Sequence, residues 1–260
     1  MSFDGFEHME HRLGWKHEYW DGAARLSPQG SAVSSLQCRL GSSRVSPPPL
    51  REGERLRLVS AADEPALVDL FVRTFDDAIE YAGWPEEAYR DDARDSIASF
   101  FGTPPKHRHD RPRAGRPDLS FVMDSGEALL AAILVRSIRR GPIVEPIMVH
   151  PSRHRRGLAT TLLSATLGAL HASAETTLFS RCHLGNAASV AWHERNGFED
   201  IPNFFAASHR RHHFTWLAGY FDRVGRPDEA SRMRQLAEQW NAIAKKVEAS
   251  DERWSGGLLD

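Results

Sequence analysis

The chain has 260 residues, a formal charge of −2 and an isoelectric point of about 6.7. This balance argues against nucleic acid or an anionic membrane as a general partner, because either would select a strongly basic surface. Acidic residues at the N-terminus and the absence of an apolar core region there predict no secretory signal. The longest apolar run, residues 128–135, is far shorter than the ~20 residues of a membrane span. With two cysteines, too few for a disulfide framework, we expect a cytoplasmic protein.

The N-terminal part of the sequence predicts an addition to the main domain. An aromatic-rich segment leads into Asp21-Gly22, a dipeptide typical of tight hairpin turns, so residues 15–26 predict a β-hairpin. The run Pro47-Pro48-Pro49 is stiff and lacks backbone donors, and we place a boundary there. We therefore expect three segments: 1–50 as an N-terminal extension with hairpin and linker, 51–205 as the main domain, and 206–260 as a C-terminal helical extension.

Regular elements begin after the proline run. Residues 55–59 alternate as a strand, and Asp63 is expected to cap a helix with Pro65 in its first turn. A second helix is predicted from about Pro85. The basic stretch 106–116 has no periodicity and predicts a solvated loop. Further strands are predicted at 121–123, 128–135, 143–149 and 177–182, of which 128–135 is apolar on both faces and therefore central.

The C-terminal part of the sequence is less decisive. Residues 203–217 fit either two strands or a helix. From Pro227 an amphipathic pattern predicts a long helix, which must pack on this domain or on a second copy, so a homodimer stays open. His209, His212 and His213 share one helical face, but no fourth ligand is spaced with them, and we predict no metal site.

The most informative stretch is residues 149–159, VHPSRHRRGLA, which predicts a strand, an arginine-flanked glycine turn and the start of a helix. The first N–H groups of a helix have no partner within it, and the macrodipole adds roughly half a positive charge there. Gly157 lets the backbone approach an anion without a Cβ in the way. The turn therefore predicts a phosphate cradle, with a basic helix start that only faces water as the alternative.

Residues 186–198, NAASVAWHERNGF, form a second motif one strand and one loop beyond the first. Together the two motifs resemble the GCN5-related N-acetyltransferase (GNAT) family. The first matches the family signature V-x-P-x-x-[QR]-x-x-G-x-[GA] at Val149, Pro151, Gly157 and Ala159. The second matches a later family signature at Asn186, Glu194, Arg195, Gly197 and Phe198. The chain departs from the family at His154, where Gln or Arg is usual, and at His193, where tyrosine is frequent.

The resemblance implies an α/β (α+β) fold in which helices flank a mixed, mostly antiparallel central sheet, with the hairpin and the C-terminal helix as additions. It also implies acetyl-CoA as co-substrate, without a metal, bound where strand 143–149 splays from strand 177–182. A backbone N–H near Met148 or Val149 would polarise the thioester carbonyl. The residues expected to bind acetyl-CoA are Met148, Val149, His154, Arg155, Arg156, Gly157, Leu158, Ala159, Thr160, Asn186 and Ser189.

The family's chemistry also suggests a base and an acid. Glu145 is the candidate base, because family members often carry a catalytic glutamate on this strand. Pro146 disturbs the pleat, so the face that Glu145 takes stays open, with a surface carboxylate as the alternative. His193 is the candidate acid for the departing thiolate, although a thiol with a pKa of about 8.5 leaves with modest help. Asn186 is expected to cap its helix and to contact the pantetheine.

We therefore predict an N-acetyltransferase in which a primary amine of a small molecule or peptide attacks the thioester directly. One alternative is a non-catalytic acyl-CoA-binding regulatory module, suggested by the unusual His154 and His193. Another is a toxin that acetylates charged tRNA, suggested by the basic stretch 106–116, although the near-neutral chain argues against nucleic acid. Cys182 predicts a buried thiol rather than an acyl-carrying nucleophile. The sequence does not identify the acceptor.

Overall fold

A computed structural model describes residues 1–42, 45–104, 113–173 and 175–249. The chain divides into two compact units. Among the described residues, the first unit contains Met1–Ser35, Cys182–Ala191 and Asp200–Ala249. The second unit contains Leu36–Arg181 and Trp192–Glu199. Among the described residues, no helix is long and apolar enough to cross a bilayer.

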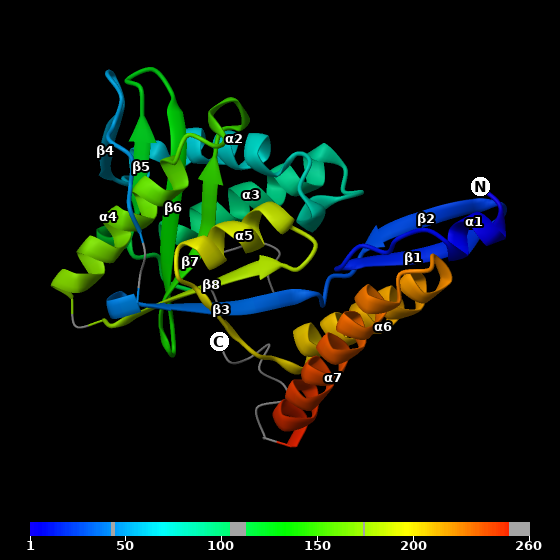
Figure 1. The fold of residues 1–260 in the computed structure, drawn as a ribbon. Helices are drawn as coiled ribbons and strands as arrows, with labels where there is room; N and C mark the ends of the chain where they lie inside the picture. Colours follow the sequence, from blue (N-terminus) through cyan, green and yellow to red (C-terminus); the bar gives the residue numbers. More distant parts are fainter. Residues whose placement is uncertain (43–44, 105–112, 174, 250–260) are drawn as a thin grey trace. The chain divides into compact units, whose positions relative to one another are not determined.

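Seven strands form a mixed sheet in the order β4-β5-β6-β7-β8-β3-β9 (Figure 1). Their bounds are β3 Val33–Arg39, β4 Arg55–Leu58, β5 Phe121–Asp124, β6 Leu129–Ile138, β7 Gly141–Val149, β8 Thr177–His183 and β9 Glu199–Ile201. Strands β4 to β7 pair antiparallel, whereas β7 and β8 pair parallel. The five strands predicted after the proline run are confirmed, and the mostly antiparallel sheet agrees with the expected fold class.

Helices cover both faces of this sheet. Their bounds are α2 Glu64–Phe75, α3 Glu86–Phe100, α4 Leu158–Ala172 and α5 Ala187–Arg195. Helices α2 and α3 pack in one core with Ala132 and Leu134 of β6 and Met148 of β7. Helix α4 packs against β5 and β6, and Thr166 on it donates to the carbonyl of Leu119. Because side chains alternate along a strand, the fully buried Ile133 belongs to the face that α4 covers.

The first unit contains the predicted hairpin. Its elements are α1 Phe3–Glu7, β1 Trp15–Trp20, β2 Ala23–Pro28, α6 Phe204–Arg223 and α7 Pro227–Ala249. Strands β1 and β2 pair antiparallel from Trp15↔Pro28 to Trp20↔Ala23. Asp21 and Gly22 turn the chain with φ of 48° and 73°, the left-handed conformations that a two-residue hairpin turn requires. The hairpin prediction is confirmed.

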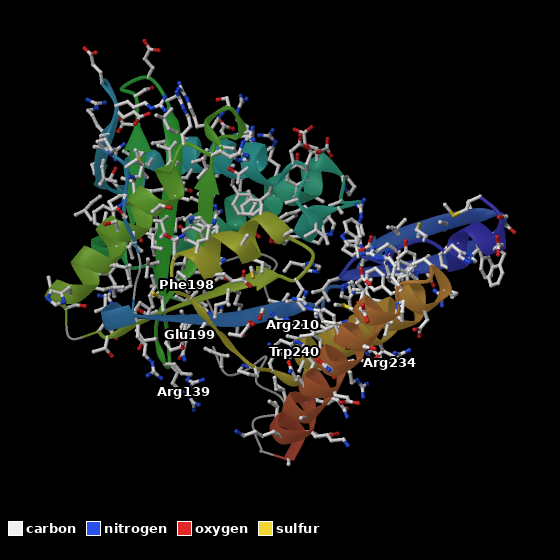
Figure 2. The ribbon with its side chains drawn as sticks, viewed as in Figure 1. Arg139, Phe198, Glu199, Arg210, Arg234 and Trp240 are labelled. Carbon is white, nitrogen blue, oxygen red and sulfur yellow. The ribbon has the colours of Figure 1, made fainter. Side chains whose placement is uncertain are left out.

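Helices α6 and α7 pack against each other along the first unit. The guanidinium of Arg210 lies 4.4 Å from the ring centroid of Trp240, and Arg234 forms an ion pair with Asp222 (Figure 2). Asn203 begins α6 by accepting the N–H of Ala206 at 2.8 Å. The strand alternative for residues 203–217 is therefore wrong and the helical one is right. The long C-terminal helix is confirmed, and a homodimer stays a prediction.

Strand β3 is a feature that the sequence did not reveal. It lies between β8 and β9, so a segment from the N-terminal region completes the sheet. After Phe198, where two strands and a helix had both stayed open for residues 203–217, one short strand, β9, precedes α6. Ser34, Ser35, Leu36 and Cys38 are buried, which makes β3 an internal strand despite its polar residues. Because Ser34 and Ser35 are polar but buried, the alternation of apolar residues does not predict this strand.

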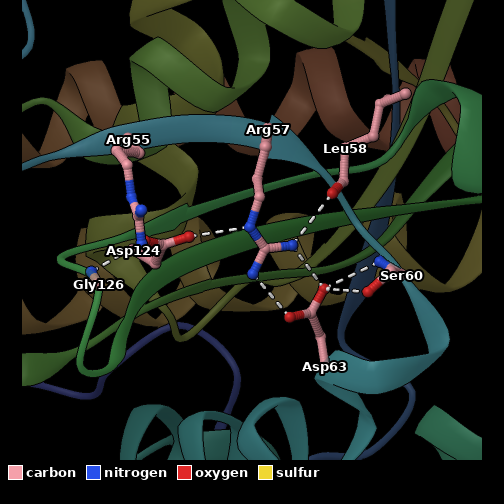
Figure 3. Close-up of polar contacts among 7 residues, drawn as sticks. All are labelled: Arg55, Arg57, Leu58, Ser60, Asp63, Asp124 and Gly126. Atoms are coloured by element: carbon pink, nitrogen blue, oxygen red, sulfur yellow. Dashed lines mark hydrogen bonds and ion pairs between the residues drawn. The ribbon is translucent and has the colours of Figure 1, made fainter.

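The predicted cap of α2 differs in detail. Asp63 ends a 3-10 turn, Ala61–Asp63, and its side chain makes no cap bond to α2. Its carboxylate instead accepts the Ser60 N–H at 2.8 Å and two bonds from the guanidinium of Arg57 (Figure 3). A strong cation partner therefore competes successfully with the helix terminus for this carboxylate.

Candidate active site

Strands β7 and β8 separate at one end. Their single aligned pair is Ile143↔Phe179, near the start of both strands. The two strands run parallel, and their C-terminal halves lie beyond this one aligned pair. Met148 and Val149 therefore lie on the part of β7 beyond its aligned pair with β8, and their contact with a co-substrate stays a prediction.

The register of β6 and β7 sets the direction of the backbone groups in this gap. His150 donates its N–H to the carbonyl of Leu130 at 2.9 Å, and the next pair is Ala131↔Val149. Antiparallel pairs alternate between bonded and non-bonded, so the N–H and carbonyl of Val149 point away from β6. Those of Met148 point toward β6. Of the two predicted thioester donors, the register therefore favours Val149.

The turn after β7 contains two left-handed residues. Arg155 has a φ of 59° and Gly157 a φ of 82°. Gly157 is the N-cap of α4, and the first bond within the helix runs from the Thr161 N–H to the Gly157 carbonyl at 2.9 Å. The N–H groups of Leu158–Thr160 precede that bond and have no partner within the helix. This terminus has the donors and the dipole that an anion needs.

The side chain of His154 connects the turn before α4 to the end of β7. Its Nε2 lies 3.0 Å from the carbonyl oxygen of Val149, and the hydroxyl of Thr74 on α2 donates to the same carbonyl at 3.3 Å. The side chain that departs from the family pattern thus closes the loop between β7 and α4. Its backbone remains part of the turn.

Gly157 has a neighbour that the sequence did not predict. A Cβ built on Gly157 would lie 2.5 Å from Cγ and 2.9 Å from Cδ of Pro48. We expected the missing Cβ to give room to a phosphate. In the structure the ring of Pro48 takes the space, so the glycine is required by this contact and by its positive φ.

Glu145 lies at an irregularity of β7. Ile133 pairs with Ile147 and Val135 with Val144, so Glu145 and Pro146 together face one residue of β6. Such a bulge redirects a side chain, which explains why the sequence could not fix its face. The Glu145 carboxylate accepts the guanidinium of Arg113 at 2.9 Å, and both side chains are largely buried. Glu145 is therefore a partly buried, ion-paired carboxylate, and its role as a base stays a prediction.

Arg113 is a site residue that sequence reasoning missed, because it lies in the basic stretch assigned to a solvated loop. Its carbonyl accepts a bond from Arg136 at 2.9 Å, and Arg136 is 1% exposed on β6. Arg136 also donates to the carbonyl of Ser96 on α3. These bonds place Arg113, and with it Glu145, on the α3 side of the sheet. Residues 106–112 of the predicted loop lie outside the described residues.

His193 is buried, with 1% of its surface exposed. Its Nε2 lies 2.8 Å from the hydroxyl oxygen of Ser180 on β8. The imidazole meets the rings of Trp192 and Phe198 edge to face, at centroid distances of 4.8 and 4.9 Å. The structure thus brings His193 to β8, and its role as an acid stays a prediction.

Asn186 and Ser189 belong to the first unit, whereas the cradle and β7 belong to the second. The Ser189 N–H donates to the side-chain oxygen of Asn186 at 3.1 Å. This bond confirms that Asn186 caps α5. Their contact with pantetheine stays a prediction.

Two of the three histidines considered as metal ligands lie within hydrogen-bond distance of other side chains. His209 lies 2.9 Å from the hydroxyl of Ser31, and His212 lies 2.9 Å from the guanidinium of Arg211. Within the described part of the chain, no three His, Cys, Asp or Glu residues are placed to hold a metal ion. Cys182 is a buried thiol, in agreement with the packing role predicted for it.

The comparisons with known proteins concern the second unit above all. The family model described as Acetyltransferase (GNAT) family matches residues 71–198. No curated protein matches the chain. Several solved structures are similar, but their sequence identities to this chain are below 20%. The family assignment therefore depends on the family model.

Three of these structures illustrate the likeness. A GCN5-related N-acetyltransferase from Sphaerobacter thermophilus is 15% identical with a TM-score of 0.42, over 65% of this chain and 48% of that one. The ribosomal-protein-S18-alanine N-acetyltransferase from Escherichia coli is 19% identical, with a TM-score of 0.41 and coverages of 57% and 79%. The PaiA N-acetyltransferase from Thermoplasma acidophilum, in complex with coenzyme A, is 15% identical, with a TM-score of 0.43 and coverages of 56% and 89%.

The chain thus spans about half the length of the Sphaerobacter protein. The matched residues 71–198 include β7, the cradle, Glu145 and His193. Residues 71–198 thus form a domain of the acetyltransferase (GNAT) family.

Proposed function

We propose that the chain transfers the acetyl group of acetyl-CoA to a primary amine by direct attack. The observation that carries the proposal is the divergence of β7 from β8 directly before a helix N-terminus that begins in a left-handed turn. This arrangement offers one strand edge for an extended arm and one set of free N–H groups for a diphosphate.

The co-substrate would bind in two parts. Its pantetheine amides would pair with the free edge of β7, as an added strand does. Its diphosphate would accept N–H groups from the turn around His154–Thr160, with charge from Arg155 and Arg156. The Val149 N–H would donate to the thioester carbonyl and stabilise the oxyanion of the tetrahedral intermediate.

The reaction needs a nucleophile, a proton acceptor and a proton donor. An ordinary amine is protonated at neutral pH, so a base must accept one proton before the attack. Glu145 would accept it, directly or through water. The amine nitrogen then attacks the thioester carbon, a C–N bond forms, the C–S bond breaks, and the sulfur leaves as a thiolate. As the C–S bond breaks, the nitrogen would lose its second proton to solvent, and His193 would donate a proton to the thiolate and regain one from solvent. The products are the N-acetylated amine and free CoA.

A non-catalytic acyl-CoA-binding module is the second candidate. It is favoured by the ion pair between Glu145 and Arg113, which occupies one oxygen of the proposed base. A tRNA-acetylating toxin remains the third, and it depends on the basic stretch that begins at Lys106. The acceptor itself is open between a small molecule, a peptide terminus and a lysine side chain.

Release of free CoA thiol from acetyl-CoA, followed in the presence and absence of a panel of amines, tests the proposal. The expected result is amine-dependent thiol release together with a product heavier by one acetyl group. Binding of acetyl-CoA without any amine-dependent release would favour the regulatory module. A substrate restricted to aminoacylated tRNA, with binding that weakens steeply with salt, would favour the toxin.

A further inference from the structure

The proline segment before β4 contacts the turn that begins α4. Pro47, Pro48 and Pro49 are exposed, and each lacks a backbone donor and has a fixed φ. The segment therefore cannot pair as a strand and behaves as a stiff spacer. Of its three rings, that of Pro48 lies against the Cα of Gly157, where an added Cβ would meet it at 2.5 Å.

The segment is anchored on the sheet side. The Arg51 N–H donates to the carboxylate of Glu54 at 3.1 Å, and the Glu54 N–H donates to the Arg51 carbonyl at 3.0 Å. Strand β4 follows at once, and Arg55 is paired with the buried Asp124 of β5. Pro48 thus lies three residues before a hydrogen-bonded turn that leads directly into β4.

A cavity lies beside the contact between Pro48 and Gly157. This cavity of about 250 Å³ lies between the segment and α4, lined by Pro48, Pro49 and Leu50 on one side and by Arg156, Leu158 and Thr161 on the other. The three atoms nearest to a Cβ built on Gly157 all belong to the ring of Pro48. The turn that it touches contains Arg155, a non-glycine residue with positive φ, which is costly unless neighbouring structure holds it.

We infer that Pro48 is a positioning residue for the diphosphate of acetyl-CoA, acting through Gly157. The ring holds the left-handed turn so that the N–H groups of Leu158–Thr160 converge before the ligand arrives. Such preorganisation raises affinity by lowering the ordering cost of binding. The inference rests on the proposed function, because it assumes that the turn binds the diphosphate.

Pro48→Ala tests this contact, since it removes Cγ and Cδ, the two atoms that face Gly157, and keeps the backbone. Pro47→Ala is the matched control, because it loses a proline from the same segment, whereas the three atoms nearest to a Cβ built on Gly157 all belong to Pro48. For each full-length variant, calorimetry gives the Kd of acetyl-CoA. Competition against acetyl-CoA gives the Ki of inorganic diphosphate and the Ki of acetyl-pantetheine, which carries the thioester arm without the diphosphate.

The expected result is that Pro48→Ala raises the Kd of acetyl-CoA and the Ki of diphosphate by about the same factor, roughly fivefold. The Ki of acetyl-pantetheine stays unchanged, and Pro47→Ala behaves as the wild type. Unchanged constants for Pro48→Ala overturn the inference. So does equal weakening of all three ligands, which indicates general damage, or tighter binding, which indicates that the segment obstructs the turn.

Thermal stability and ligand binding by the wild type separate the role of Pro48 from other causes of weak binding. If Pro48→Ala lowers the thermal midpoint, Pro48→Gly and measurements well below that midpoint separate binding from unfolding. If the wild type binds neither acetyl-CoA nor diphosphate, the proposed function fails. If the wild type binds both and Pro48→Ala binds them equally well, only the role of Pro48 fails.

Discussion

The Nε2 of His193 lies 2.8 Å from the hydroxyl of Ser180, so a buried imidazole on α5 is fixed against strand β8. Because β8 is the sheet neighbour of β7, this bond brings the predicted acid to one side of the gap that we propose for the co-substrate. A histidine there replaces the tyrosine that the family often uses.

Replacement of His193 by Phe should lower kcat by about 10²-fold, the lower end of the effect of a general acid, since a thiolate is a good leaving group. Phe keeps the edge-to-face packing with Trp192 and Phe198, so the fold should persist. The measurement is kcat for acetyl transfer across the neutral pH range, with Ser180→Ala as the companion variant. A kcat within threefold of wild type at every pH would make His193 a packing residue.

Glu145→Gln should lower kcat by about 10²-fold or more, because the amide cannot accept the amine proton. The KM for acetyl-CoA should change little, since Glu145 is not expected to touch the co-substrate. The matched control is Glu127→Gln, which neutralises an exposed carboxylate in the turn between β5 and β6. Full activity of Glu145→Gln in a transfer assay would remove this residue from the mechanism and leave it the structural partner of Arg113.

The network in Figure 3 should stabilise the edge of the sheet. Arg57 donates to the carboxylates of both Asp63 and Asp124, whose side chains are 10% and 7% exposed. Asp63→Asn should therefore lower the free energy of unfolding by about 1–3 kcal/mol, measured by denaturant titration at neutral pH. Asp118→Asn is the control, because its pair with Arg116 is exposed and should contribute less than about 1 kcal/mol.

The same network predicts a loss of stability in acid. The hydrogen bonds from Arg57, followed by that from the Ser60 N–H, lower the pKa of Asp63 below its usual 3.8. Burial raises the pKa of Asp124, but the bonds from Arg55, Gly126 and Arg57 together lower it. A depressed folded-state pKa stabilises above the unfolded value, so stability is lost as the pH falls through 3.8 and below. Asp63→Asn should flatten this part of the profile, and an unchanged slope would contradict the assignment.

A second acid-sensitive group lies in the first unit. The ring of His11 stacks between His17 at 4.0 Å and Trp216 at 3.8 Å. Burial, then the neighbouring His17, His213 and Arg223, lower the pKa of His11 to about 4, and burial lowers that of His213 to about 4.

Between pH 4 and 6.5 the unfolded chain should therefore bind more protons than the folded one, and stability should fall as the pH falls through this window. His11→Phe keeps an aromatic ring in the stack and removes one titrating group. We expect a shallower loss of stability for the variant, followed by Trp fluorescence at each pH. Identical pH profiles for variant and wild type would show that His11 does not titrate in this range.

Much of the fold followed from sequence pattern. The hairpin at Asp21-Gly22, the strands from β4 to β8 and helix α7 carry strong local signals, because turn chemistry and apolar periodicity act over a few residues. Strand β3 could not be predicted, since its serines are buried by partners distant in the sequence. Helix α6 was ambiguous for the same reason, because packing rather than periodicity decides a segment with a weak apolar face.

In the candidate site, too, local features could be predicted from the sequence, whereas tertiary contacts could not. The cradle depends on a local turn, and the sequence around Gly157 predicted it. The partners of its side chains depend on tertiary contacts: Arg113 reaches Glu145 across 32 positions, and Pro48 reaches Gly157 from before β4. The face of Glu145 depends on a bulge that only the register of β6 and β7 reveals.

Calorimetric titration of the full chain with acetyl-CoA tests the central claim most directly. Any side chain at Gly157 would clash with Pro48, so a substitution there would not test the charge of the turn alone. The better variant replaces both Arg155 and Arg156 by Glu, which reverses the charge of the turn. The control reverses Arg139 and Arg140, two exposed arginines at the other end of β7. We predict micromolar binding by the wild type and by the control, and its loss in the Arg155→Glu, Arg156→Glu variant. Failure of the wild type to bind acetyl-CoA, or equal binding by all three proteins, would contradict the account.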